Sequence, residues 1–161
     1  MHKNEQSCIM KYIVWLPAIL VGAAIFYFSN QPASVSTEMS DGVTTLLLHG
    51  AERLGLLELS PTLVTSLCEK LAFPVRKSAH ILEYMILHGT ILFALFFQNE
   101  TMRGSKWLKW AFIMTVCYAA SDEFHQLFVP GRAGMVQDVV IDSLGVAVVT
   151  WILWKNCRRI G

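Results

Sequence analysis

Four long apolar runs constrain this chain more than any other feature of its sequence. They cover about residues 10–29, 78–97, 107–128 and 135–154, and their charged side chains lie toward the ends. A helix of about 20 apolar residues can cross the hydrocarbon core of a bilayer. A composition of 54% hydrophobic and 16% charged residues also suits lipid better than water. We therefore predict an all-α membrane protein, a single domain over residues 1–161 built as a bundle of four transmembrane helices.

The positive charges near the ends of the runs predict the orientation of this bundle. With a cytoplasmic N-terminus, eight of the 13 lysines and arginines lie on the cytoplasmic side, in keeping with the positive-inside rule. These eight are Lys3, Lys11, Arg103, Lys106, Lys109, Lys155, Arg158 and Arg159. The other five, on the opposite side, are Arg53, Lys70, Arg76, Lys77 and Arg132. We predict that both termini are cytoplasmic, an N-in/C-in topology.

The polar segment between the first two runs, residues 30–75, is then extracytoplasmic. Ser60 and Pro61 have the N-cap and first-turn pattern of a helix start. An i+4 stripe of leucines follows: Leu63, Leu67 and Leu71. Residues 37–49 carry a weaker apolar stripe. We predict one or two short amphipathic helices here, which lie on the membrane surface or roof the bundle.

Charge and cysteine spacing argue against several other classes of protein. A net charge of +1 offers no basic excess for a nucleic-acid partner. The four cysteines, Cys8, Cys68, Cys117 and Cys157, form no CxxC pair and no CxxC-to-HxxxH pattern. Neither a zinc site nor a disulfide framework is therefore indicated, and we expect the cysteines to pack as small apolar side chains.

The remaining ionisable side chains are predicted to meet at one depth of the membrane. In the topology above, the second run begins, the third ends and the fourth begins on the extracytoplasmic side. Helical spacing places one polar stripe on each of these helices. The stripes are Lys77, His80 and Tyr84; Asp122, His125 and Gln126; Asp138 and Asp142. Charged groups in a span turn toward one another or toward water, so we predict an inward-facing polar pocket.

Three smaller features complete this prediction. Gly145 continues the stripe of Asp142 without a side chain, which allows two helices to approach closely. Residues 129–134 form a tight proline and glycine turn that is expected to hang Arg132 over the acidic layer. His88 lies lower in the second run, alone, and is expected to be a satisfied packing residue rather than a ligand.

The predicted polar layer carries more negative than positive charge. Five carboxylates, Glu83, Asp122, Glu123, Asp138 and Asp142, face three permanent cations, Arg76, Lys77 and Arg132. A salt-bridge cluster that only fixes helix packing should balance better, because an unpaired buried charge is costly. The surplus leaves three alternatives open: protonated histidines, protonated carboxylates or a bound divalent metal. The candidate metal ligands are His80, Asp122, His125 and Asp138.

Four segments of the chain resemble the VanZ-like membrane proteins of bacteria, which are related to the teicoplanin resistance protein. They are FSNQP at 28–32, KSAHILEY at 77–84, DEFHQLFVPGR at 122–132 and DVVIDSLG at 138–145. The residues that match the family pattern are Lys77, His80, Tyr84, Asp122, Glu123, His125, Gln126, Arg132, Asp138 and Gly145. Asp142 departs from it, since many members carry Asn there. The resemblance implies a multi-pass protein of the bacterial cell envelope, in the cytoplasmic membrane, linked to glycopeptide resistance.

Three functions remain open at this stage. The favoured one is a pocket that binds the head group of a membrane lipid or a lipid-linked cell-wall precursor. Its predicted ligand-binding residues are Lys77, His80, Tyr84, Asp122, Glu123, His125, Gln126, Arg132, Asp138 and Asp142. The second is a membrane-embedded hydrolase or transferase acting on a lipid-linked phosphate, with His80, His125, Asp122 and Asp138 as catalytic candidates. The third is a scaffold that only places partner helices.

Overall fold

The computed structural model of the chain describes residues 11–98 and 106–160, and the side chains only as far as residue 156. All regular secondary structure in these ranges is helical, which confirms the all-α prediction. Within these ranges residues 11–13 are helical, and the longer helices are α2 (Leu16–Ser29), α3 (Ala33–Arg53), α4 (Pro61–Gln98), α5 (Lys106–Gln126) and α6 (Val136–Ile160). The predicted cytoplasmic residues Lys3 and Arg103, and the side chains of Arg158 and Arg159, lie outside the described part, as does residue 10 of the first run.

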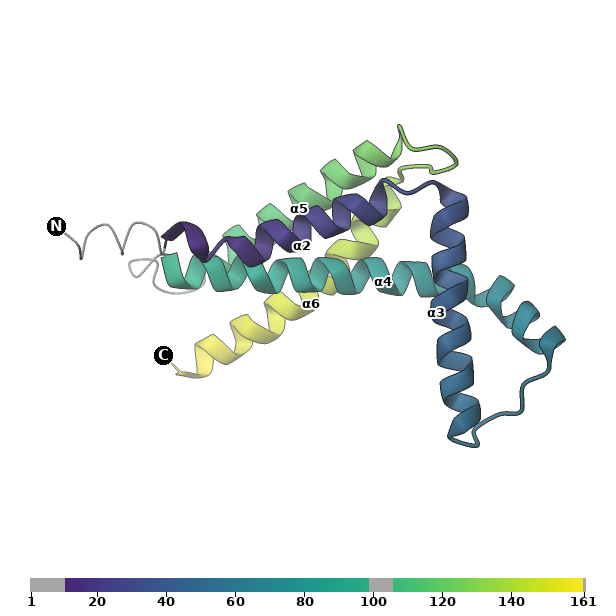
Figure 1. Cartoon of the computed structure of the whole chain (residues 1–161). Coiled ribbons are helices and arrows are strands. Elements are labelled where there is room, and N and C mark those ends of the chain that lie inside the picture. The colour runs from purple at the N-terminus through teal and green to yellow at the C-terminus, as the bar shows by residue number, and fades with distance from the viewer. Residues whose placement is uncertain (1–10, 99–105, 161) are drawn as a thin grey trace.

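The helices α2, α4, α5 and α6 form the bundle, and α3 stands across its end (Figure 1). The chain direction alternates between neighbours, because α2 and α5 run opposite to α4 and α6. Two hydrogen bonds far apart in sequence show this register. Trp15 Nε1 donates to Gln98 Oε1 at 2.9 Å at one end of the bundle, and Gln126 Nε2 donates to Ser29 Oγ at 2.8 Å at the other. The start of α2 and the end of α6 both lie at the end remote from α3 (Figure 1).

Three of the described helical segments are long and apolar enough to cross a membrane: Lys11–Ser29, Pro61–Gln98 and Val136–Asn156. Their outer faces expose large apolar side chains, such as Val140, Leu144 and Val148 along α6. Such faces suit acyl chains. The helix α5 is 21 residues long but carries Lys106, Lys109, Asp122 and Glu123, so the four-span count stays a prediction.

The buried core of the bundle is built from small and branched apolar side chains. Leu87, Ile91 and Leu95 of α4 pack with Leu108 and Ala111 of α5. The prediction for Gly145 is confirmed, since a Cβ there would come 2.7 Å from Ile81 Cγ2. The helices α6 and α4 therefore touch at a distance that only glycine allows at this position.

The segment between the first two spans differs from the prediction of separate short helices. Residues 37–49 belong to a longer helix, α3, which covers Ala33–Arg53. A helix does begin at Pro61, and Ser60 Oγ accepts the Leu63 N–H at 3.3 Å as the predicted N-cap. This helix does not end before the membrane run. It continues through Pro74 to Gln98 as one helix of 38 residues, because a proline can remain inside a helix at the cost of one backbone hydrogen bond and a bend.

Candidate functional site

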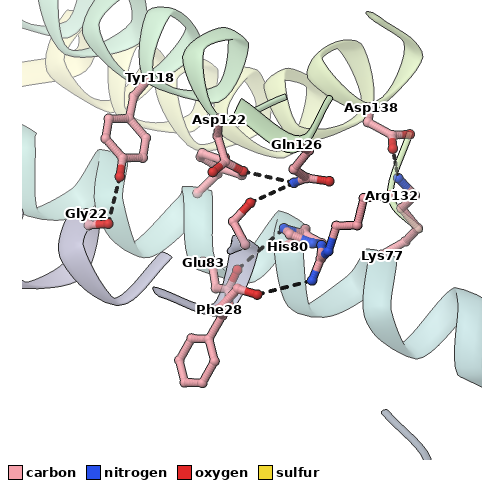
Figure 2. A network of polar contacts seen from close by, with 12 residues as sticks. Gly22, Phe28, Lys77, His80, Glu83, Tyr118, Asp122, Gln126, Arg132 and Asp138 are labelled. Carbon is pink, nitrogen blue, oxygen red and sulfur yellow. Dashed lines mark hydrogen bonds and ion pairs between the residues drawn. The ribbon is translucent and has the colours of Figure 1, made fainter. Parts of the chain in front are cut away.

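A buried hydrogen-bond network joins three helices at the end of the bundle near α3. Asp122 Oδ2 accepts the Tyr84 hydroxyl at 3.0 Å and Gln126 Nε2 at 3.1 Å. Gln126 also donates to Ser29 on α2. Figure 2 shows Asp122 and Gln126 within this network. Asp122 is 3% exposed, and its second oxygen, Oδ1, has no hydrogen-bond partner. The predicted gathering of Tyr84, Asp122 and Gln126 is thus present, with one acceptor left over.

The start of α6 brings further charges to the same end of the bundle. Lys77 Nζ forms an ion pair with Asp138 (Figure 2). Glu123 Oε2 accepts the Met135 N–H at 3.0 Å, immediately before α6 begins. Asp142 is 2% exposed, and its Oδ1 has no hydrogen-bond partner. Lys77 is therefore engaged by Asp138, and Asp142 remains a buried carboxylate with unused hydrogen-bonding capacity.

The turn between α5 and α6 directs Arg132 toward α2. Gly131 adopts φ of 74°, a conformation that favours glycine. At Gly134 a Cβ would collide with the carbonyl oxygen of Glu123, so the turn lies tightly on the end of α5. Arg132 Nε donates to the Gln31 carbonyl at 2.8 Å and its Nη2 donates to the Phe28 carbonyl at 3.1 Å. The guanidinium thus caps the C-terminal end of α2, where a cation also suits the helix dipole.

This result refines the expectation that Arg132 hangs over the acidic layer. Asp122, Glu123 and Glu83 are within electrostatic reach of it, but the hydrogen bonds of Arg132 go to main-chain carbonyls. Burial, followed by the charge of Arg76, lowers the pKa of Arg132 from its ordinary value. Because that ordinary value is about 12.5 or higher, the side chain stays charged at neutral pH.

A cleft of about 520 Å³ opens between α3 and α4, and we call it the α3–α4 cleft. Its walls are mainly apolar, with Met39, Val43 and Leu47 from α3 facing Leu71 and Leu82 from α4. Four charged or ionisable side chains line it as well: Arg76, His80, Glu83 and Arg132. His80 Nδ1 lies 3.5 Å from Glu83 Oε2, at the outer limit of contact, and makes no hydrogen bond. The cleft therefore combines an apolar groove with a charged region.

The ten predicted ligand-binding residues divide into three groups in the structure. His80 and Arg132 line the α3–α4 cleft. Seven others lie between the helices beside this cleft: Tyr84, Asp122, Glu123, Gln126, Lys77, Asp138 and Asp142. His125 lies apart, since its Nε2 is 3.1 Å from Asn30 Oδ1 and its ring stacks near Phe26 with centroids 4.6 Å apart. A ligand-binding role for all ten stays a prediction.

The four candidate metal ligands are not brought together. His80 approaches Glu83, Asp138 pairs with Lys77, and His125 faces Asn30. Among residues 11–98 and 106–160, no three His, Cys, Asp or Glu side chains are arranged to hold a metal ion. A bound divalent metal was one of three alternatives left open by the sequence, and the described residues do not group its four candidate ligands, His80, Asp122, His125 and Asp138, into one set. The predicted stripes share one end of the bundle, but their side chains point to different partners.

His88 has the packing role predicted for it. It is fully buried, with Nδ1 3.2 Å from Thr115 Oγ1 and Nε2 2.9 Å from Thr150 Oγ1. The ring thus connects α4, α5 and α6. The two threonines were not singled out from the sequence, although each is an isolated hydroxyl residue in an apolar stretch. Of the α3 wall of the cleft, the stripe predicted in residues 37–49 contained Val43 and Leu47, whereas Met39 was not singled out.

Comparison with known proteins places this arrangement in a family. The family model described as VanZ/LLP1 matches residues 14–158, nearly the whole chain. The chain belongs to the VanZ/LLP1 family. The matched range contains α2 to α5, α6 as far as residue 158 and every residue that lines the α3–α4 cleft, so the cleft lies within the part that matches the family. No curated protein and no solved structure matches the chain.

Proposed function

We propose that this VanZ/LLP1 protein binds the anionic head group of a membrane lipid or a lipid-linked cell-wall precursor in the α3–α4 cleft. The observation that carries the proposal is the pairing of an apolar groove with two arginines, Arg76 and Arg132, in a cleft of about 520 Å³. Ligand sites of about 300–1,000 Å³ with apolar walls and a few polar groups are typical of small-molecule binding. An amphipathic molecule fits both parts of this cleft.

The charges that line the cleft differ from those of the polar end as a whole. Arg76 and Arg132 face one carboxylate, Glu83, so the lining has a net positive charge when His80 is neutral. The surplus carboxylates, Asp122 and Asp142, are buried between the helices instead. Arginine side chains form strong, charge-assisted hydrogen bonds with phosphate oxygens. The cleft thus suits a phosphate group, although the whole predicted layer is acidic.

Four membrane crossings and cytoplasmic termini in a bacterial cell membrane belong to the same proposal. With 21 residues at about 1.5 Å each, α5 reaches about 31 Å, which matches the hydrocarbon core. Two observations support a fourth crossing: α5 packs beside α4 and α6, and the start of α2 and the end of α6 share one end of the bundle (Figure 1). Cysteine accessibility at residues 106 and 131, measured from each side of the membrane, tests it. Labelling of both positions from one side contradicts a crossing by α5.

A membrane-embedded hydrolase or transferase is the second candidate, and one observation favours it. His80 and Glu83 are adjacent in the cleft, and the buried Nδ1 of His80 has no hydrogen-bond partner. A histidine beside a carboxylate can act as a general base. Of the four catalytic candidates, His80 alone lines the cleft. Under this alternative, His80→Gln keeps lipid binding but abolishes turnover, whereas under the binding proposal no turnover is measured in either protein.

The binding proposal is tested by identifying lipids that co-purify with the protein in mild detergent, using mass spectrometry. We expect an anionic lipid at near-stoichiometric amounts with the native chain, and several-fold less with Arg76→Gln. Lys109→Gln is the matched control, because Lys109 is exposed at the opposite end of the bundle. Equal lipid in all three proteins contradicts the proposal.

A second pair of variants tests lipid binding without changing charge: one fills the cleft and the other is its control. Ala79 lines the cleft, so Ala79→Phe should displace the lipid. Ala120 is exposed on α5 and does not line the cleft, so Ala120→Phe should retain it. In cells, teicoplanin susceptibility is the readout suggested by the family resemblance. If the cleft has that role, Ala79→Phe changes susceptibility and Ala120→Phe does not.

A further inference from the structure

The helix α3 has three faces of different chemistry. Its buried face carries small or compact side chains at i+4 spacing, Ser36, Ser40, Thr44 and Leu48. The hydroxyl groups of Ser40 and Thr44 donate to backbone carbonyls one turn earlier, at 2.9 and 2.8 Å. These hydroxyls therefore need no partner on α4, and the face can pack closely against that helix.

The large apolar side chains of α3 are left partly exposed. Val35, Met39, Val43, Leu46 and Leu47 are 37–73% exposed. At about 100° per residue they occupy one side of the helix next to the packed face. Glu38, His49 and Glu52 occupy the remaining side and are exposed as well. An exposed apolar side and an exposed charged side on one helix are typical of a helix at the boundary between lipid and water.

The direction of α3 agrees with this division. It runs across the axis of the bundle, at the end where α2 finishes and α5 turns into α6 (Figure 1). A helix that crosses the axis of membrane-spanning helices lies in the plane of the membrane. Three side chains of its apolar face, Met39, Val43 and Leu47, also form the wall of the α3–α4 cleft. The cleft therefore opens on the lipid side of α3.

We infer that α3 lies in the lipid–water interface and that the α3–α4 cleft opens sideways into the bilayer, so that its occupant is a phosphate-bearing lipid that enters from the leaflet. The placement of α3 stands by itself, whereas the identity of the occupant rests on the proposed function. Met39, Val43 and Leu47 contact the chain of this lipid. Arg76 and Arg132 contact its phosphate. A water-soluble phosphate has nothing to place against the apolar wall.

The placement of α3 is tested by fluorescent labels in proteoliposomes. Single cysteines are introduced as Leu46→Cys, Glu38→Cys and Glu52→Cys in a full-length chain whose four native cysteines are changed to alanine. We expect a lipid with a quencher on its acyl chain to quench the label at position 46 several-fold more than those at 38 and 52. Iodide in the water phase should show the reverse order.

Each other result of the labelling overturns the interfacial placement. Iodide quenching at all three positions means that α3 stands in water. Lipid quenching at all three means that α3 is immersed in the acyl chains. Circular dichroism checks that each variant keeps its helix content. A variant that has lost helix content is replaced by one labelled at Leu54, which lies just past α3 and is 76% exposed.

The source of the ligand is tested by native mass spectrometry of the full chain in detergent. The probes are phosphatidylglycerol, phosphatidylcholine and glycerol 3-phosphate. We expect phosphatidylglycerol to bind best, and Val43→Asn to weaken its binding several-fold by making the apolar wall polar. Gly42→Asn is the matched control, because a side chain at Gly42 has open space and does not face the cleft.

The two hypotheses fail in different ways in this second test. Binding of glycerol 3-phosphate as tight as that of phosphatidylglycerol overturns entry from the leaflet but leaves an anion site at the arginines. Failure of all three probes to bind overturns the proposed function. In that case the labelling result alone still decides whether α3 lies in the interface.

Discussion

The two ends of the bundle are held together by different forces. At the end where α2 begins and α4 finishes, Leu92, Leu95, Leu108 and Ala111 are 0–6% exposed and pack against one another in the core. At the end near α3, Tyr84, Asp122, Gln126 and Ser29 are equally buried but are joined by hydrogen bonds. The core of the first end consists mainly of close packing. The second end includes two buried carboxylate oxygens without a hydrogen-bond partner, one of Asp122 and one of Asp142.

This difference indicates that the packed end serves stability, whereas the polar end serves function. Lipid tails are as apolar as leucine, so the packed end gains from close contact rather than from removal of water. Burying carboxylates is costly unless every oxygen is satisfied, so the polar end gives up stability. A protein that only needed to hold its helices together would not require these groups. The α3–α4 cleft lies beside the polar end, where this cost is concentrated.

The largest effect is expected where the turn meets α5 at the polar end. Gly134→Ala places a methyl group against the carbonyl oxygen of Glu123, and the main chain must move. Overpacking of this kind costs about 2–3 kcal/mol. Thermal unfolding in detergent measures it. Gly89→Ala is the control, because nothing lies within 4 Å of its Cβ position; a comparable loss in that variant would mean that the tight turn is not the cause.

A smaller loss of stability is expected from a substitution at the packed end. Leu108 is 2% exposed, so Leu108→Ala leaves a cavity and should cost about 2 kcal/mol. Leu144→Ala, at a position 61% exposed on α6, should change the unfolding temperature little. Lipid co-purification should be unchanged in both, measured below the unfolding temperature. Loss of bound lipid in Leu108→Ala would show that the two ends are not separable.

Removal of one hydrogen bond at the polar end should lower the free energy of unfolding by still less. Tyr84→Phe deletes the donor to Asp122 and keeps the packing, so we expect a loss of about 1 kcal/mol. Tyr27→Phe, at a position 64% exposed, is the control. Equal unfolding temperatures for the native chain and Tyr84→Phe would show that this bond does not stabilise the polar end.

The smallest change is expected from Asp142→Asn. Its Oδ1 has no hydrogen-bond partner, so the substitution should shift stability by less than about 0.5 kcal/mol. Asp138→Asn should be clearly worse, because Lys77 then loses its ion-pair partner. Thermal unfolding of both variants decides the point, and a reversed order would mean that Asp142 carries the more important contact.

The end of the bundle at which the polar residues gather was predictable from the sequence. Their charges lie near the ends of the apolar runs, and successive runs cross in opposite directions, which together fix their depth. Tyr84, Asp122 and Gln126 meet for this reason. The partners of Arg132 were not predictable, since main-chain carbonyls of α2 carry no signal in the sequence. The four candidate metal ligands find separate partners in the structure, because helical spacing gives the face of a side chain but not the neighbour that it contacts. His125 is the clearest case, as it turns to Asn30.

The helix boundaries show the same limit. Ser60 and Pro61 correctly marked a helix start, because capping is local. The continuation through Pro74 was not predictable in this way, because a proline inside an apolar pattern can either end a helix or remain within it. The apolar stripe in residues 37–49 was predicted, but the sequence did not show that it forms a cleft wall opposite α4. Met39 and Val43 belong to a helix whose outward face is apolar, the reverse of what a water-soluble protein displays.

The uninterrupted length of α4 has a consequence for how deep the protein sits. Its 38 residues span about 57 Å, nearly twice the thickness of the acyl-chain layer at about 30 Å. The apolar run at residues 78–97 can fill this layer, and the turns before it, which carry Glu69, Lys70, Arg76 and Lys77, then extend beyond it. In our proposal α3 lies in the lipid–water interface and thereby fixes the depth of the bundle in the membrane. Thicker or thinner bilayers should then alter the tilt of the bundle while the cleft remains level with the phosphates.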